Sequence, residues 1–270
     1  PRGAEQTLSL LPLLKQHGVP MIGPSSGATV FHQPVLAHVF NVRAAYPRES
    51  EKAITHLASI GITRIAVVHA DDTFGADGLD GAQKGLGQNK LTAVLVAKFD
   101  RSKPDFSAIA TQVVKAEAQA VMVIGSGTAV VQGIKQIKAA GSNAQFVTLS
   151  NNASEGFIKL LGEQGHGVIV TQVFPQSFNF PVVKEASQLA KAQGIALVSP
   201  AMLEGFATAK VLVEAVRRSG AKPTRDKLLA SLDNFRYDLG GLEVSYDKTD
   251  HTGLDYADLS IISADGKFRR

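Results

Sequence analysis

Residues 64–78 read Arg64-Ile-Ala-Val-Val-His-Ala-Asp-Asp-Thr-Phe-Gly-Ala-Asp-Gly78, which is an apolar strand, a polar turn and the start of a glycine-punctuated helix. The same succession returns at 119–128, where an apolar run is followed by Ser126-Gly127-Thr128. It returns again at 145–152, which ends in Ser150-Asn-Asn152. Open α/β sheets hold small ligands at the carboxyl ends of their strands. The sequence therefore predicts three polar strand ends along one edge of a sheet.

The chain alternates helix and strand as far as Thr171. Apolar runs predict strands at 20–23, 39–43, 64–70, 91–98, 119–125, 145–149 and 167–171. Helical spacing predicts helices at 4–17, 76–89, 106–117, 128–141 and 153–162, with a kink at Pro12 in the first. A further helix is predicted to begin at Pro47. This alternation indicates an α/β fold with parallel strands and helices on both faces. After Pro175 the rhythm breaks, with helices near 181–193, 200–218 and 224–233 and strands at 242–247 and 256–262.

The composition indicates a globular protein that has no nucleic-acid partner. The chain has 270 residues, of which 44% are hydrophobic, and a net charge of +4. Its basic residues are scattered, with only short pairs such as Arg217-Arg218, whereas tracking phosphates needs a concentrated basic face. The absence of cysteine excludes disulfides, thiol catalysis and cysteine-bound zinc. The seven histidines follow no ligand spacing, so neither a metal nor a cofactor is predicted.

Two motifs offer enzymatic alternatives. Gly23-Pro-Ser-Ser-Gly27 matches the Gly-x-Ser-x-Gly elbow of serine hydrolases, with Ser25 as the nucleophile. Asp247 and His251 have the chain order that such an elbow requires, although both lie in a hydrophilic turn. Gly125-Ser-Gly127 has the strand-to-helix position of a dinucleotide fingerprint, but it lacks the third glycine and a downstream acid. The simpler interpretation of the first motif is a hydroxyl-rich ligand-binding loop, and the second does not favour a dinucleotide site.

Six stretches, which follow one another along all 270 residues, resemble the leucine/isoleucine/valine-binding family of ABC-transporter solute-binding proteins. They are Gly23-Pro-Ser-Ser-Gly-Ala28, Phe40-Asn-Val-Arg-Ala-Ala-Tyr46, Asp71-Asp-Thr-Phe-Gly75, Val170-Thr-Gln-Val-Phe-Pro175, Leu203-Glu-Gly-Phe206 and Asp238-Leu-Gly-Gly241. The spacing of the six is far more specific than any one of them.

The resemblance implies a periplasmic-binding-protein type I fold, which has two lobes joined by three hinge crossings. Each lobe would be a mostly parallel sheet with helices on both faces. Lobe 1 would comprise 1–43 and 174–242, and lobe 2 would comprise 44–173 and 243–270. The resemblance also implies a further segment of roughly a hundred residues, with which family members begin. Lobe 1 would be incomplete in this chain without that segment.

The resemblance also places a ligand in the cleft between the lobes. From lobe 1, a turn corresponding to Ser25, Ser26, Gly27 and Ala28 would hold the ligand carboxylate, where small residues let backbone donors approach an anion. From lobe 2, an aromatic ring corresponding to Phe74 would pack on the ligand. The remaining polar contacts would come from Ser126, Gly127, Ser150 and Asn151. Leucine-binding members carry a tyrosine where this chain has Phe74, and a glutamate for the ligand's ammonium where it has Ser150.

The function implied is that of a non-enzymatic, periplasmic or lipid-anchored extracytoplasmic protein whose signal peptide has been removed. It would deliver a small carboxylate-bearing solute to the membrane subunits of an ABC permease by hinge closure. An ammonium buried without a carboxylate partner costs several kcal/mol, so an amino acid competes here with an aliphatic or aromatic acid that lacks an amine. The alternatives are a serine esterase that uses Ser25, and the ligand-sensing domain of a receptor or repressor.

Overall fold

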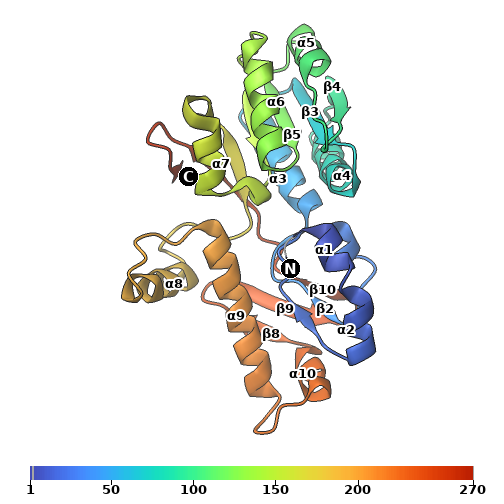
Figure 1. The fold of residues 1–270 in the computed structure, drawn as a ribbon, viewed down its shortest axis with the longest axis vertical. Coiled ribbons are helices and arrows are strands. Elements are labelled where there is room, and N and C mark those ends of the chain that lie inside the picture. Colours follow the sequence, from blue (N-terminus) through green and yellow to red (C-terminus); the bar gives the residue numbers. More distant parts are fainter. Residues whose placement is uncertain (2, 270) are drawn as a thin grey trace. The chain divides into compact units, whose positions relative to one another are not determined.

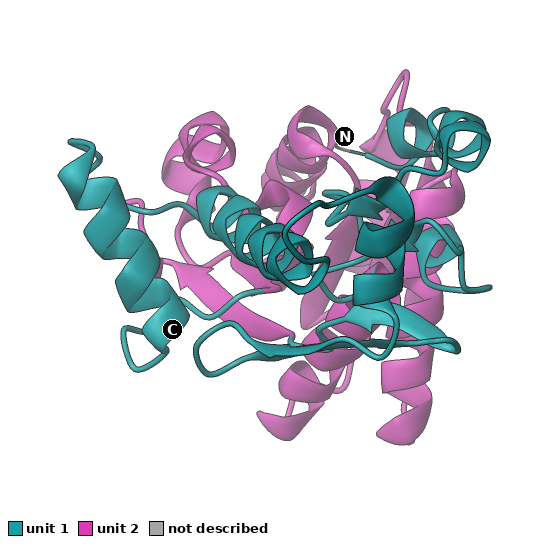
Figure 2. Cartoon of the chain, turned by 90° about the horizontal axis from the view of Figure 1, so that it is seen from below, with its two compact units in different colours: residues 1–45, 174–256 teal, residues 46–173, 257–270 magenta. Residues whose placement is uncertain are grey.

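The structure is a computed structural model that describes residues 1 and 3–269. The chain divides into two compact units, which Figure 2 shows in different colours. Unit 1 comprises residues 1–45 and 174–256, and unit 2 comprises residues 46–173 and 257–270. The chain therefore passes from one unit to the other three times.

Unit 2 is built on a seven-stranded sheet in the order β12-β11-β7-β6-β5-β3-β4. Figure 1 labels three of these strands, β3, β4 and β5. The middle of the sheet is parallel, as the alternation of helix and strand predicts, whereas β11 and β12 join one edge antiparallel. The strands are β3 (Ile65–Ala70), β4 (Leu95–Phe99), β5 (Ala120–Ile124), β6 (Gln145–Thr148), β7 (Ile169–Gln172), β11 (Asp258–Ile262) and β12 (Phe268–Arg269).

Helices cover both faces of this sheet, so its inner strands are buried on both sides. Every residue of β5 is buried, which is the continuous apolar pattern of a central parallel strand. One face packs against α5 (Ser107–Lys115), α6 (Gly127–Ala139) and α7 (Glu155–Leu161), with Phe106, Ile134 and Phe157 in the shared core. The remaining helices of unit 2 are α3 (Tyr46–Ser59) and α4 (Thr73–Gln88), with two short 3₁₀ turns, η2 (Ser150–Asn152) and η3 (Gly162–Gly165).

Glycines on α4 allow it to pack very closely on α3. A Cβ built on Gly81 would lie 2.1 Å from the carbonyl oxygen of Pro47, and one on Gly85 would lie 2.9 Å from Cβ of Ile54. At the start of the same helix, a Cβ on Gly75 would lie 1.8 Å from the carbonyl oxygen of Ala70. The glycine pattern in this stretch therefore fixes where α4 leaves β3 and how tightly it contacts α3.

Unit 1 has two smaller sheets in its described residues. β1 (Met21–Ile22) and β2 (Val39–Phe40) form a parallel pair, and β8 (Arg236–Asp238), β9 (Glu243–Asp247) and β10 (Asp250–Gly253) form an antiparallel sheet. The larger sheet of this unit is thus antiparallel, in contrast to the mostly parallel sheet expected for this lobe. The helices are α1 (Ala4–Leu8), α2 (Leu11–His17), η1 (Thr29–Phe31), α8 (Pro181–Ala192), α9 (Pro200–Arg218) and α10 (Arg225–Leu232).

The expected helix at 4–17 is two helices. The chain turns at Ser9 and Leu10, and Pro12 stands in the first turn of α2. A proline is favourable there because the first helical N–H groups have no partner within the helix. Pro12 therefore starts a helix instead of kinking one.

Residues 243–256 lie in unit 1, so the third crossing follows Tyr256 instead of lying near Leu242-Glu243, where the family resemblance placed it. The hydrogen bonds explain this. β9 pairs with β8 and β10, and the Tyr246 hydroxyl donates to the carbonyl oxygen of Asn41 at 2.7 Å. The stretch 247–253, expected as a hydrophilic turn, contains β10, in which His251 is buried against Phe40.

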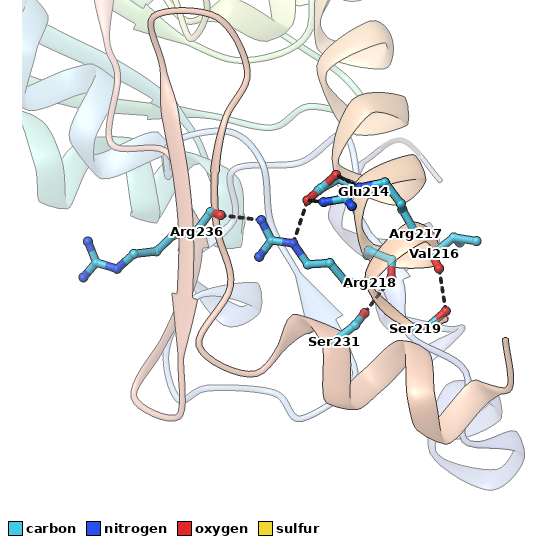
Figure 3. A network of polar contacts seen from close by, with 8 residues as sticks. Glu214, Val216, Arg217, Arg218, Ser219, Ser231 and Arg236 are labelled. Carbon is cyan, nitrogen blue, oxygen red and sulfur yellow. Dashed lines mark hydrogen bonds and ion pairs between the residues drawn. The ribbon is translucent and has the colours of Figure 1, made fainter. Parts of the chain in front are cut away.

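A buried acid of α9 holds two arginines of the same helix, one of which reaches β8 (Figure 3). Glu214 accepts hydrogen bonds from Arg217 Nε and Nη2, both at 2.8 Å, and from Arg218 Nε at 2.7 Å. Arg218 also donates from Nη2 to the carbonyl oxygen of Arg236 at 2.7 Å and lies over the Phe235 ring. These arginines hold the pKa of Glu214 down, to about 2. The C-terminal end of α9 is thereby attached to β8.

Candidate functional site

Three strand ends of unit 2 meet at the carboxyl edge of its sheet. β3, β5 and β6 are neighbours and run parallel, so the residues that follow them emerge at the same edge. The side-chain amides of Asn151 and Asn152 donate to the carbonyl oxygen of Gly125, at 3.0 and 3.2 Å. These bonds attach the end of β6 to the end of β5. The edge therefore carries the predicted group of polar strand ends.

Phe74 lies in the first turn of α4, whose N-cap is Asp72. The Asp72 carboxylate accepts a hydrogen bond from the Gly75 N–H at 2.9 Å and pairs with Arg101 at 2.7 Å. The Phe74 ring is buried, contacts Tyr46 edge-to-face with centroids 4.6 Å apart, and has the Arg101 guanidinium 5.3 Å from its centroid. Phe74 is thus part of an aromatic and cationic group at the end of β3.

Ser126 and Gly127 stand at the N-terminus of α6. Ser126 is the N-cap residue, and its side chain makes no capping hydrogen bond. A Cβ on Gly127 would meet nothing within 4 Å, so there is open space beside this residue. Backbone N–H groups at the start of a helix attract acceptors and anions. This end of β5 can accommodate a polar ligand group without steric obstruction from Gly127.

Ser150 is bonded to an acid that the sequence interpretation missed. Its backbone N–H donates to Glu49 Oε2 at 2.9 Å, and its hydroxyl donates to Glu49 Oε1 at 3.0 Å. Glu49 is fully buried in the first turn of α3 and also accepts a hydrogen bond from the Thr171 hydroxyl. In the sequence Glu49 marks the start of a helix, and nothing local connects it to a serine 101 residues away.

The turn Ser25 to Ala28 belongs to unit 1. Ser25 pairs with the chain start, because its N–H donates to the carbonyl oxygen of Pro1 at 3.0 Å and its carbonyl oxygen accepts from Gly3 at 3.2 Å. The Ser26 hydroxyl accepts a hydrogen bond from the Ala28 N–H at 3.3 Å. Ser26, Gly27 and Ala28 are buried, while Ser25 is half-buried. The structure thus places four of the predicted site residues in unit 1 and the other five in unit 2.

The residues proposed as partners of a nucleophilic Ser25 have other roles. His251 Nδ1 is 3.1 Å from the carbonyl oxygen of Leu36 and 3.0 Å from that of Val39. The Asp247 carboxylate accepts hydrogen bonds from the backbone N–H groups of Thr249 and Asp250, at 2.7 and 3.0 Å. Asp247 therefore stabilises the turn between β9 and β10, and His251 attaches β10 to residues 36–39, so this geometry does not favour the hydrolase interpretation.

Unit 1 also buries a charged group beside the first crossing. Arg43 is 3% exposed, its Nη1 lies 3.9 Å from Glu204 Oε2, and its Nε donates to the carbonyl oxygen of Ala44 at 3.3 Å. His32 is buried nearby, with Nδ1 3.2 Å from the Thr252 hydroxyl. Burial, aided by the positive charge of Arg43, lowers the pKa of His32 to about 4. His32 is therefore neutral at pH 7.

Residues 1 and 3–269 contain neither a membrane-spanning helix nor a cluster of metal-ligating side chains. None of the described helices is both long and apolar enough to span a bilayer. In the same residues there is no group of three or more His, Asp or Glu side chains that could hold a metal ion.

A family model of periplasmic binding proteins matches residues 3–267. The chain belongs to the periplasmic binding protein family. This agrees with the resemblance seen in the sequence, and the type I fold class is confirmed. Because the match runs through both units, the family assignment applies to the whole described chain.

Solved structures of similar proteins extend this finding. A substrate-binding periplasmic protein from Ralstonia solanacearum is 29% identical, with a TM-score of 0.82 over 98% of this chain and 77% of its own. A possible leucine/isoleucine/valine-binding protein from Rhodopirellula baltica SH 1 is 22% identical, with a TM-score of 0.87 over 99% of this chain and 75% of its own. A branched chain amino acid ABC transporter from Thermus thermophilus with bound valine is 19% identical, with a TM-score of 0.81 over 99% of this chain and 75% of its own. The last two establish only that the fold is shared.

Proposed function

We propose that this protein is an extracytoplasmic solute-binding protein that binds a small carboxylate-bearing ligand and delivers it to an ABC permease. The observation that carries the proposal is the group of polar strand ends at one edge of the unit 2 sheet, in a chain that belongs to the periplasmic binding protein family. The ligand would be a branched-chain or other amino acid, or an aliphatic or aromatic acid. The valine bound to the protein from Thermus thermophilus supports this size of ligand.

The mechanism we propose is hinge closure. Ligand contacts to residues of both units would favour a closed state over an open state of similar energy. The carboxylate would be held by the turn from Ser25 to Ala28, and the rest of the ligand by the strand ends that carry Phe74, Ser126, Gly127, Ser150 and Asn151. The permease would recognise the closed state.

A thermal-shift screen followed by calorimetry tests this function. The full chain is incubated with L-leucine, its 2-oxo acid and benzoate, and a ligand that binds only the folded protein raises the unfolding midpoint. Gly127→Leu would fill the open space at the end of β5 and is expected to weaken binding at least tenfold. Gly87→Leu is the matched control. Gly87 also faces open space, but it lies in the last turn of α4, away from the strand ends that carry the predicted site. Equal binding by the two variants would contradict the placement of the site.

A further inference from the structure

The buried carboxylate of Glu49 controls what Ser150 can offer to a ligand. Ser150 has two hydrogen-bond donors, its backbone N–H and its hydroxyl, and both are donated to Glu49, at 2.9 and 3.0 Å. The Thr171 hydroxyl holds the same carboxylate from β7. Glu49 is fully buried, whereas Ser150 is half-buried. The buried Glu49 can therefore influence a ligand only through its hydrogen bonds to the half-buried Ser150.

These bonds determine the polarity of the end of β6. A hydroxyl has one donor and two acceptor lone pairs, so a Ser150 hydroxyl that donates to Glu49 can only accept from another group. Chains of hydrogen bonds polarise their members, and a negative charge at one end strengthens the acceptor at the other. A ligand group that meets Ser150 must consequently donate a hydrogen bond, and a cationic donor is favoured most.

We propose that Glu49 is a positioning residue that makes the Ser150 end of the site selective for an amino group. This inference rests on the proposed function, since it takes Ser150 as part of the ligand site. The sequence indicated that this end carries no acid, because Ser150 stands where leucine-binding relatives carry a glutamate. The structure brings an acid from α3 into a hydrogen bond with Ser150.

The alternative is that Glu49 only joins three elements of unit 2. Its hydrogen bonds connect α3 with the start of η2 and with β7. A purely structural residue would affect all ligands alike when it is changed. Selectivity between an amino acid and the acid that lacks only the amine separates the two roles.

The experiment measures that selectivity by calorimetry on the full chain. The probes are two matched pairs, L-leucine with 4-methyl-2-oxopentanoate and L-phenylalanine with phenylpyruvate. Glu49→Gln keeps the size of the side chain and removes its charge. We expect the ratio of amino-acid to oxo-acid affinity to fall at least tenfold in this variant. Ser150→Ala, which removes the hydroxyl with less disturbance of the core, is expected to lower the same ratio.

Glu51→Gln is the matched control on the same helix. Glu51 pairs with Lys84 Nζ at 2.9 Å and accepts a hydrogen bond from Gln88 at 3.0 Å, so its removal should leave the ratio unchanged. If Glu49→Gln does not fold, Ser150→Ala decides the question. Equal losses for both members of a pair, or tighter binding of the oxo acids by the unchanged protein, would overturn the inference while leaving the function standing. No binding of any of the four probes would overturn the inference, and failure of benzoate as well in the thermal-shift screen would reject the proposed function.

Discussion

At the scale of single residues, unit 1 buries several polar side chains. Asn41 is fully buried and donates from its amide to the carbonyl oxygens of Phe31 and His251, at 2.8 and 3.2 Å. His32 has one ring nitrogen beside Thr252, and its Nε2 has no hydrogen-bond partner among the described residues. Buried polar groups without a full set of partners cost stability. His32 is therefore a residue at which protonation affects folding directly.

We predict that His32 makes unit 1 sensitive to mild acid. Its pKa is lowered to about 4 in the folded protein, mainly by burial, with Arg43 opposing the charged form and Asp250 favouring it. In the unfolded chain His32 takes up a proton as the pH falls below about 6.5, whereas in the folded protein it does so only near pH 4. The free energy of unfolding is therefore unaffected by His32 above pH 6.5 and decreases as the pH falls from 6.5 towards 4. Linkage gives a loss of about 2 kcal/mol at pH 5.

Urea unfolding at pH 7.5 and pH 5.0 checks this prediction. His32→Asn should remove about 2 kcal/mol of the difference between the two pH values. His17→Asn, at an exposed histidine of the same unit, should leave the difference unchanged. An identical pH dependence in the His32 variant and the unchanged protein would show that another group is responsible.

Glu214 also loses its contribution to stability in acid, but at a lower pH than His32. Its pKa is lowered to about 2, first by hydrogen bonding to Arg217, so its contribution is present above pH 4.5 and is lost as the pH falls towards 2. At pH 7 we expect Glu214→Gln to lower the free energy of unfolding by about 1 to 3 kcal/mol, because hydrogen bonds to both arginines lose their charge. Chemical denaturation measures this. Glu243→Gln, at an exposed pair with Arg236 of 3.4 Å, should change it by less than about 1 kcal/mol. Equal losses of stability in the Glu214 and Glu243 variants would show that burial does not strengthen the pairing of Glu214 with its arginines.

At the scale of elements, the sequence predicted what local pattern determines. The apolar runs at β3, β5 and β6 located the strand ends, because strand burial depends on adjacent residues. The capping role of Asp72 was not predicted, and α4 begins three residues before the expected helix at 76–89. β8 and β10 were missed because they are short and polar, and they exist through pairing with β9. The contact of Glu49 with Ser150 spans 101 residues and could not be derived from periodicity.

The close packing of α3 and α4 predicts that two glycine-to-alanine changes on α4 alter the free energy of unfolding in opposite directions. Gly81→Ala should destabilise the protein by at least about 2 kcal/mol, because the new Cβ would lie 2.1 Å from the Pro47 carbonyl oxygen and the backbones must separate. Gly87→Ala meets nothing within 4 Å and should stabilise the protein by about 0.5 to 1 kcal/mol through helix propensity. Thermal and urea unfolding measure both. Two changes of the same sign would show that propensity, not contact, dominates.

At the scale of the whole molecule, neither unit is a continuous piece of chain. Unit 2 consists of residues 46–173 and the last segment, 257–270, which contributes β11 and β12 to its sheet. β11 pairs with β7 from Asp258↔Gln172 to Ile261↔Ile169, and Ile262 is buried in the core of the unit. All of unit 1 precedes this segment. The two units should therefore respond differently when the segment is removed.

A chain that ends after Tyr256 tests this organisation. It would keep every residue of unit 1 but expose one side of β7, so the free energy of unfolding of unit 2 should fall by about 3 kcal/mol or more, from the loss of Ile262 burial and of the ladder hydrogen bonds. Hydrogen exchange reports on each unit separately. Protection should fall in β5, β6 and β7 and be retained in β8 and β9, whose hydrogen-bonding partners are intact. A chain that ends after Ile262 keeps β11 and should lose far less protection in β7. If the shorter chain instead lost protection equally in both sheets, the units would form one cooperative structure, and the division of the chain at Tyr256 would have no thermodynamic meaning.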